Sequence, residues 1–513
     1  MNQRRWGAIF SYINIVLTVI VGLVYTPIML RLLGQSEYGL YSMIGSLAGY
    51  LSVLDMGLGN TIVRYTAKNR IDGSKQREYE LNGLFLLVYA IIGLIALFLG
   101  FILYINIDFL FGVTLSDIEL SRARIMMILL ILNVAISFPL SIFASIMQAY
   151  ERFVFLRISN ILRVLINPLL VLPFLYFGYG SVMMVVISTI LNIICLLANL
   201  YYCWHYLKVK FKIGKYSKSF VHEICSYSFF IFLNAIMDKV YWSSGQFVLG
   251  IVSGTISVAV YAIAMQFMMM YMNFSGAISG VMLPKVTMMV ANNATVAELS
   301  QLFIKIGRLQ YLVVGYIFAM FVLVGKSFIE LWAGNNYIAA YPMILVLMAA
   351  LMIALVQNVG ISILMAMNLN RYRMTWYSIC ALLSLGISFP LADIWGGLGC
   401  AMATSLSLII STGFIMNRYY AKKIHLQIKK FWLEIGHLML ITIIFVILGS
   451  IINYLLSANV SWSSLLFKIG VYSIIYGMIM YKLGMNSYEK SLCTSALTRH
   501  LPRKRGRHGY SKK

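Results

Sequence analysis

The chain has 513 residues, of which 61% are apolar and only 11% charged, and its formal net charge is +24. Soluble globular domains contain about 25% charged residues, which cover their surface. The composition therefore excludes a soluble enzyme, a secreted disulfide-stabilised domain and a disordered protein. Apolar runs long enough to cross a bilayer recur along the whole chain, and they predict an all-α polytopic membrane protein.

The runs are continuously apolar rather than alternating, which also excludes an outer-membrane barrel. The six cysteines have no metal-binding spacing, so we expect them to pack within helices and to form neither a metal site nor disulfides. The sequence contains no nucleotide-binding motif, redox centre or catalytic triad, and we therefore expect no enzymatic activity and no cofactor. The positive charge indicates cytoplasmic loops, and we expect no nucleic-acid partner.

Apolar runs of about 20 residues predict fourteen membrane-spanning helices. The expected spans are residues 9–33, 38–63, 81–105, 124–148, 154–177, 181–204, 226–252, 256–283, 308–329, 341–367, 374–394, 398–419, 434–456 and 464–483.

The charges of the loops test this count. If the N-terminus is cytoplasmic, every second loop should be cytoplasmic and rich in Lys and Arg, because such loops resist translocation. The loops at 64–80, 205–222 and 420–433 do contain basic clusters, whereas the loop after the third span contains Asp108 and Glu119. We therefore expect both termini to be cytoplasmic.

The first six predicted helices and the next six look like two copies of one unit. Gly178 and Arg152 match Gly397 and Arg371 at the same offset of 219 residues. An even number of helices per copy gives a parallel repeat, which places a substrate between two halves. The predicted domains are an N-terminal six-helix bundle at 1–210, a C-terminal six-helix bundle at 211–425, helices 13 and 14 at 426–485, and a basic cytoplasmic tail at 486–513.

Ionisable side chains inside apolar spans cost about 3 kcal/mol each on insertion scales, so they mark functional candidates. Asp238 and Lys239 lie in the middle of the seventh span. Adjacent helical residues project about 100° apart, so the two do not pair face to face, although either can pair with a neighbouring helix. Asp55 lies in the second span beside Gly57 and Gly59, which allow close helix approach or local unwinding.

Four more cations are candidates. Arg31 ends the first span on the outer side, where the positive-inside rule disfavours a cation. This position favours a functional role for Arg31. Arg64 can either bind a ligand or reach the cytoplasmic surface. Arg163 and Lys285 lie nearer the cytoplasmic side, where they could also extend to the interface.

Three features together resemble a known family. They are Leu30–Gly34 leading into Glu37–Tyr41, the segment Asp55–Gly59 continuing to Arg64, and two six-helix halves followed by two helices. This pattern resembles the multidrug/oligosaccharidyl-lipid/polysaccharide (MOP) exporter superfamily, and within it the polysaccharide (Wzx-type) flippase branch, which has a MATE-like fold.

The resemblance implies a flippase that moves undecaprenyl-diphosphate-linked oligosaccharide repeat units across the bacterial cytoplasmic membrane by alternating access. Such units serve O-antigen, capsule or exopolysaccharide synthesis, which implies membrane lipid, a glycan polymerase and glycosyltransferases as partners. In the related lipid II flippases, the Arg matching Arg31 faces a central cavity, and two extra helices form a groove for the lipid tail.

An anionic diphosphate needs cations in a low-dielectric site. The substrate-binding candidates are therefore Arg31, Lys239, Arg64, Arg163 and Lys285. Asp55 and Asp238 are the ion-coupling candidates. Asp238 is the better switch, because its protonation would leave Lys239 unbalanced and free to hold a phosphate, and the alternative is that Asp238 only neutralises Lys239. A cation-coupled multidrug antiporter of the same fold is the alternative, because acidic groups suit cationic drugs. A membrane scaffold or a glycan polymerase is a third interpretation, although polymerases usually need a large extracytoplasmic loop.

Overall fold

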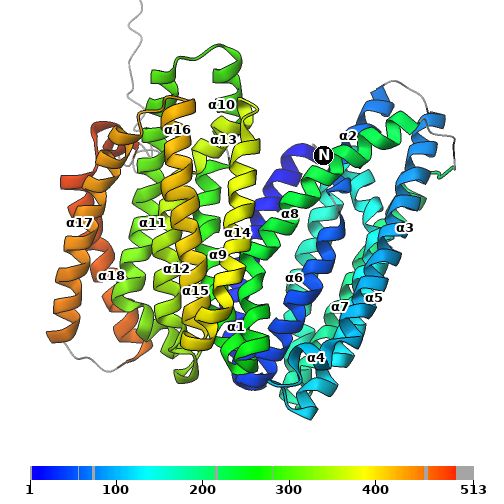
Figure 1. Ribbon diagram of the computed structural model, residues 1–513, viewed down its shortest axis with the longest axis horizontal. Helices are drawn as coiled ribbons and strands as arrows, with labels where there is room; N and C mark the ends of the chain where they lie inside the picture. The colour runs from blue at the N-terminus through cyan, green and yellow to red at the C-terminus, as the bar shows by residue number, and fades with distance from the viewer. Residues whose placement is uncertain are drawn as a thin grey trace, which may run out of the picture. The chain divides into compact units, whose positions relative to one another are not determined.

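The computed structural model describes residues 3–55, 57–71, 75–212, 214, 218–280, 282–455 and 460–492, so the end of the predicted tail, from residue 493, lies outside the described residues. Within these ranges every regular element is helical (Figure 1). The elements are α1 (Gln3–Ser52), η1 (Val53–Asp55), α2 (Leu58–Ile71), α3 (Lys75–Ile105), α4 (Ile107–Phe111), α5 (Asp117–Ala149), α6 (Phe153–Tyr176), α7 (Ser181–His205), α8 (Lys218–Val252), α9 (Gly254–Ser279), α10 (Met282–Ala291), α11 (Val296–Trp332), η2 (Asn335–Tyr337), α12 (Ala340–Leu355), α13 (Asn358–Ala366), α14 (Asn370–Trp395), α15 (Gly397–Leu408), η3 (Ile409–Met416), α16 (Asn417–Lys423), α17 (Ile428–Leu455), α18 (Trp462–Ile479) and η4 (Met480–Gly484).

Among the described residues, twelve helical segments are long and apolar enough to cross a membrane. The first, Ile9–Arg70, has 62 residues, or about 90 Å of helix, which is far more than one crossing needs. It bends at Gly34 and therefore makes two passes. The 35-residue helix α8 adds a span that contains Asp238 and Lys239. Each of the fourteen predicted spans thus coincides with helical structure.

Two glycines make the turns that separate the first and second helices of each predicted half. Gly34 has φ 77° and ψ 173°, a conformation that is essentially restricted to glycine. Gly254 lies between α8 and α9 with φ 76°. The two positions are 220 residues apart, close to the offset of the sequence identities. This shared geometry supports the internal repeat.

Several helices begin earlier than the apolar runs indicate, and two of them start with a capping box. The sequence predicts starts at 124 and 308, whereas α5 begins at Asp117 and α11 at Val296. Ser116 and Glu119 form a capping box at the start of α5, and Thr295 and Glu298 exchange the same hydrogen bonds at the start of α11. Caps of this kind start a helix outside the apolar region.

Contacts group the chain into two compact units. Unit 1 comprises residues 1–270, 329–351 and 370–416, and unit 2 comprises residues 271–328, 352–369 and 417–513. These contact units are not the two predicted six-helix bundles, whose division of the chain stays a prediction.

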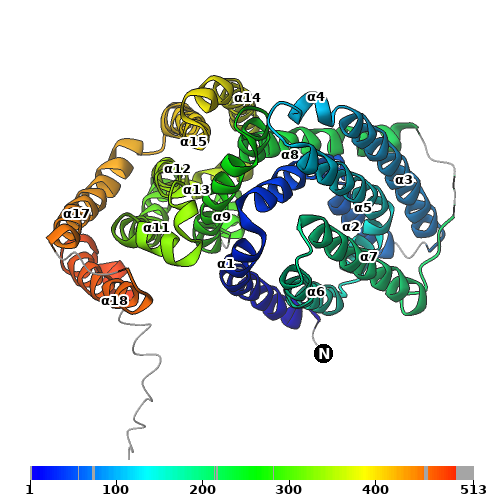
Figure 2. The same ribbon diagram turned by 90° about the horizontal axis from the view of Figure 1, so that it is seen from below.

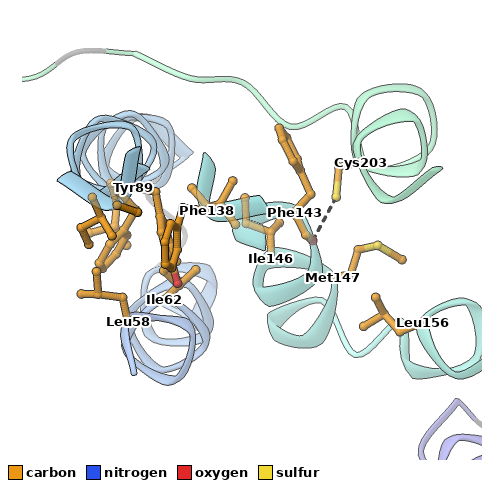
Figure 3. Close-up of a cluster of buried hydrophobic side chains, with 14 residues drawn as sticks. Leu58, Ile62, Tyr89, Phe138, Phe143, Ile146, Met147, Leu156 and Cys203 are labelled. Atoms are coloured by element: carbon orange, nitrogen blue, oxygen red, sulfur yellow. Dashed lines mark hydrogen bonds between the residues drawn. The ribbon is translucent and has the colours of Figure 1, made fainter. Parts of the chain in front are cut away.

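Within unit 1, α1 packs against α5, α6 and α7, while α3 packs on α5 and α8 packs on α14 (Figure 2). A buried cluster joins α2, α3, α5, α6 and α7 through Ile62, Tyr89, Phe138, Leu156 and Cys203, among others (Figure 3). The Cys203 thiol donates to the Phe143 carbonyl at 3.4 Å, so this cysteine packs in the core as expected. The core holds together the helices that border the cavity described below.

The motif at residues 30–41 has a structural basis. Glu37 forms an ion pair with Arg122 and accepts a 2.9 Å hydrogen bond from the backbone N–H of Ser181, at the start of α7. A Cβ atom at Gly39 would lie 1.9 Å from the carbonyl oxygen of Thr255, so only glycine allows α1 to approach α9 this closely. These contacts hold the second pass of α1 against the ends of α5, α7 and α9.

Proline in a membrane helix leaves a carbonyl without its N–H donor, and a neighbour must satisfy it. Pro27 lies inside α1 and frees the carbonyl of Leu23. The indole N–H of Trp332 donates to that oxygen at 2.7 Å. The expectation that neighbouring groups resatisfy such breaks is met at this position.

Unit 2 contains a buried ion cluster. The Arg308 guanidinium donates to both carboxylate oxygens of Glu489 at 2.7 and 2.9 Å, to Glu434 at 2.7 Å and to the Gly484 carbonyl at 2.8 Å. Arg308 and Glu489 are 5% and 2% exposed, whereas Glu434 is 41% exposed. The cluster fixes the segment after η4 to α11 and α17. Helix α17 also packs against α18 (Figure 1).

Candidate functional site

A cavity of about 580 Å³ lies inside unit 1, among α1, α5, α6 and α7. Helix α1 contributes Thr18, Tyr25 and Tyr41 from its two passes, and Ser52 from its end. The size is within the range of small-molecule sites, which is about 300–1,000 Å³. Helices α5, α6 and α7 contribute a chain of polar side chains.

Four of these polar side chains are joined by hydrogen bonds. The Arg163 guanidinium donates to the Asn192 side-chain oxygen at 2.8 Å. The Asn192 amide nitrogen in turn donates to the Asn133 oxygen at 2.8 Å and to the Ser137 hydroxyl at 2.9 Å. Among the described residues, Arg163 uses one of its five N–H donors in a hydrogen bond, and its side chain is exposed. The remaining donors are available to a ligand.

A second polar pair lines the same cavity. The Asn167 amide donates to the Ser188 hydroxyl at 3.1 Å. Pro168 follows in α6 and leaves the carbonyl of Val164 without an intrahelical donor, and both residues belong to the lining. The cavity therefore offers amides, hydroxyls and an additional backbone acceptor, which together suit a ligand with many hydroxyl groups.

The polar residues of the cavity lie near the middle of their helices. Asn133 is at the centre of α5, Arg163 and Asn167 are near the centre of α6, and Asn192 is near the centre of α7. Polar groups this far inside an apolar helix are expensive and usually serve function. Arg163 was expected nearer the cytoplasmic side, but it lies near the middle of its helix and bonds to α7 rather than extending to an interface.

Sequence reasoning did not single out the three asparagines. It ranked ionisable residues only, and an Asn in a long apolar run is a weaker departure from the pattern. The signal was nevertheless present, because Asn133, Asn167 and Asn192 each interrupt the middle of a predicted span. Three such interruptions in consecutive helices indicate one polar cavity.

Arg163 is the only charged residue in the lining of this cavity. A guanidinium surrounded by neutral amides and hydroxyls attracts phosphate or carboxylate oxygens, with which it forms charge-assisted and often bidentate bonds. A cationic ligand would be repelled by it. The electrostatics of the cavity thus favour an anionic ligand or an anionic part of a larger one.

Asp55 lies outside this lining, at the break between α1 and α2. It ends the short turn η1, and Gly57 follows with φ 65°. The Tyr89 hydroxyl donates to its carboxylate at 2.8 Å. The predicted local unwinding at these glycines is therefore present, and it places a half-buried carboxylate at an interrupted helix.

Asp238 and Lys239 point to different neighbours. The Asp238 side chain lies next to the Tyr377 phenol of α14 and close to Arg373. The Lys239 ammonium lies against α1, 3.4 Å from the place that a Cβ of Gly49 would take. Helix packing thus turns Asp238 toward α14 and Lys239 toward α1, and the coupling of Asp238 to Lys239 stays a prediction.

The remaining candidates are not brought together with these residues. Arg31 is exposed and donates to the Leu331 carbonyl at 3.1 Å, outside the cavity lining. Arg64 is exposed on α2. Lys285 is exposed on α10 and belongs to unit 2. A single cavity shared by all five predicted cations stays a prediction.

Comparisons with known proteins were made for the whole chain. Residues 6–290 match the model of a family described as "Polysaccharide biosynthesis protein". A comparison with curated proteins finds no match.

Several solved structures have a similar fold. The lipid II flippase MurJ in an inward closed conformation matches with a TM-score of 0.73 at 17% identity, over 96% of this chain and 100% of that one. An inward-facing multidrug resistance MATE family transporter of the MOP superfamily matches with a TM-score of 0.62 at 15% identity, over 79% of this chain and 98% of that one. A MOP superfamily transporter from Pyrococcus furiosus, described as having a binding pocket of reverse polarity, matches with a TM-score of 0.53 at 13% identity. The match covers 82% of this chain and 96% of that one. The predicted MATE-like fold is thereby confirmed.

Proposed function

The chain belongs to the family of polysaccharide biosynthesis proteins, a membrane transporter family, and from that premise we propose that it flips undecaprenyl-diphosphate-linked oligosaccharides. The direction is from the cytoplasmic to the outer leaflet of the bacterial cytoplasmic membrane, with both termini cytoplasmic. The product serves O-antigen, capsule or exopolysaccharide synthesis, with glycosyltransferases upstream and a glycan polymerase downstream.

The observation that carries this proposal is the charge of the cavity in unit 1. Among the described residues that line it, one is a cation, Arg163, none is a carboxylate, and nine are neutral amide or hydroxyl side chains. A diphosphate linked to a sugar presents anionic oxygens beside hydroxyl groups. Arg163 can hold the first and the amides of Asn133, Asn167 and Asn192 can hold the second.

Lys239 supplies a second cation. Its ammonium lies against Gly49, and Ser52, three residues further along α1, lines the cavity. Residues three apart share a helix face, so the ammonium approaches the face of α1 that borders the cavity. Among the described residues no carboxylate forms an ion pair with it, which leaves its charge for an anionic substrate. Arg31, Arg64 and Lys285 are proposed as additional contacts in other states of the transport cycle.

The transport cycle follows from this arrangement. The anionic head enters the polar cavity while the polyprenyl tail stays in lipid, so only the head needs a polar path. Rocking of the two six-helix halves, 1–210 and 211–425, then opens the cavity to the opposite side. We assign residues 426–485 to a surface along which the lipid tail lies.

Coupling to an ion gradient is proposed at Asp55 rather than Asp238. Asp55 lies at an interrupted helix, where a bound proton or sodium ion can change how α1 and α2 join, whereas Asp238 lies within the continuous helix α8. We expect Asp55→Asn to abolish stimulation of flipping by a proton or sodium gradient in proteoliposomes. Stimulation that persists in this variant rules out Asp55 as the coupling site.

The alternative is a cation-coupled multidrug antiporter. It requires acidic groups at the drug site, but neither Asp55 nor Asp238 belongs to the cavity lining. Proteoliposomes containing the purified chain distinguish the two functions. We expect them to expose a fluorescent undecaprenyl-diphosphate oligosaccharide to a membrane-impermeant quencher faster than protein-free liposomes, and not to accumulate ethidium. Ethidium uptake without lipid movement would favour the antiporter.

A further inference from the structure

A cluster of polar and aromatic side chains lies between α8 and α14, apart from the cavity. The Tyr377 phenol lies next to the Asp238 carboxylate, and the Arg373 guanidinium is close to both. The Arg373 guanidinium carbon lies 5.5 Å from the centre of the Tyr377 ring, within the range of a cation–π contact. All three residues belong to unit 1.

The position of Tyr377 is fixed by packing against a buried tyrosine. Tyr377 stacks on Tyr241 with ring centres 4.9 Å apart and planes 10° apart. Tyr241 is only 2% exposed, and its hydroxyl donates to the Thr404 carbonyl of α15 at 3.4 Å. Because Tyr377 stacks on a buried tyrosine that is itself hydrogen-bonded to α15, its ring keeps a fixed orientation beside Asp238.

The charges of Asp238 and Arg373 are not neutralised by a direct ion pair between the two side chains. Asp238 and Arg373 do not form an ion pair within 4.0 Å, although both are described, and Asp238 is exposed. If Asp238 served only to neutralise Arg373, a direct ion pair would be expected, because it would recover more of the cost of placing both charges in an apolar span. The open arrangement instead presents a carboxylate acceptor next to guanidinium donors.

An exposed aromatic side chain, Trp376, lies three residues after Arg373 and therefore on the same face of α14. Trp376 immediately precedes Tyr377 on α14 and is 36% exposed, with its ring 6.3 Å from that of Tyr372. Sugar rings stack their C–H faces on aromatic rings, while their neighbouring hydroxyl groups donate to carboxylates and accept from guanidinium groups. An aromatic face beside a carboxylate–guanidinium pair therefore has the chemistry of a carbohydrate site.

We propose that Asp238, Arg373, Tyr377 and Trp376 form a glycan-binding subsite, distinct from the cavity around Arg163. The subsite rests on the proposed function, because it takes the sugars of the same substrate whose diphosphate Arg163 holds. The charges of Asp238 and Arg373 offset each other, so this subsite has no net charge, whereas the cavity around Arg163 is cationic. The subsite therefore takes neutral, hydroxyl-rich sugars.

Direct binding tests the subsite without any transport. The full chain in detergent micelles is mixed with two neutral probes, N,N′,N″-triacetylchitotriose and maltotriose, and saturation transfer from protein to sugar is measured by NMR. We expect binding of at least one probe, and about a tenfold weaker affinity in Asp238→Asn, the loss expected when a charged hydrogen-bond acceptor is removed. Trp376→Ala, an exposed position, should weaken the same probe.

The matched control is Trp395→Ala, since Trp395 is 52% exposed at the other end of the same helix, outside the cluster. This control should bind like the unaltered chain. The proposal is overturned if neither probe binds, or if the three variants bind alike. Failure of the proposed function has a different signature: no flipping by the unaltered chain, with probe binding and its dependence on Asp238 and Trp376 intact.

Discussion

Arginine has two opposite uses in this chain. Arg308 is buried and surrounded by two carboxylates and a carbonyl, so its charge is compensated and its role is structural. Arg163 has one described hydrogen-bond partner, the neutral Asn192, and lines a cavity. The same side chain thus stabilises the fold in unit 2 and presents an uncompensated charge in unit 1. The difference lies in the partners, which sequence position alone does not reveal.

The Arg308 cluster yields a stability prediction with an internal control. Glu489→Ala leaves a buried guanidinium without its bidentate partner, so it should cost about 3–5 kcal/mol. Glu434→Ala removes an exposed partner of the same arginine and should cost about 1 kcal/mol or less. Thermal unfolding of the purified variants in detergent measures the order. Equal midpoints for the two variants would show that burial of Glu489 does not matter.

At the scale of elements, the kink in α1 depends on one glycine. The conformation of Gly34 lets a single run of helix turn into two membrane passes, and the contacts of Glu37 and Gly39 hold the second pass in place. Part of this was predictable, because the sequence divides the run into spans ending at 33 and beginning at 38. The φ value that makes the turn, and the contact of Gly39 with Thr255, depend on tertiary structure and were not predictable.

Two glycines of α1 give opposite predictions for the same substitution. No atom would contact a Cβ at Gly34 or at Gly45 within 4 Å, so sterics do not distinguish them. Gly34→Ala should nevertheless destabilise by about 1–3 kcal/mol, because alanine does not tolerate that backbone conformation. Gly45→Ala should be neutral or stabilise by about 0.5–1 kcal/mol through the greater helix propensity of alanine. Comparison of the two thermal midpoints tests the kink, and a Gly34→Ala midpoint at or above that of Gly45→Ala would contradict it.

At the scale of the whole molecule, the sequence predicted the architecture well and the site only in part. Each span predicted from hydropathy coincides with helical structure, since a bilayer requires long apolar helices. Ionisable residues such as Arg163, Asp55 and Asp238 stood out for the same reason. Neutral Asn192 and Asn133 did not, although they form the centre of the hydrogen-bonded network.

Partners of the singled-out residues could not be predicted. Asp238 finds Tyr377 on a helix 139 residues away, and Lys239 turns toward Gly49 on α1. The helical period fixes the angle between adjacent side chains but not which helices pack on either side. Those neighbours follow from three-dimensional packing, which a single sequence does not reveal.

The central claim is that an anionic head group passes through the cavity around Arg163. Arg163→Gln removes the charge and keeps a donor for Asn192, while Arg157→Gln removes the same charge from the same helix, α6, outside the cavity lining. The direct measurement is the initial rate at which each variant flips an undecaprenyl-diphosphate oligosaccharide in proteoliposomes. We predict that Arg163→Gln flips about tenfold more slowly or worse, the effect of losing a charge-assisted contact, and that Arg157→Gln matches the unaltered chain. Equal rates for Arg163→Gln and the unaltered chain would contradict the claim.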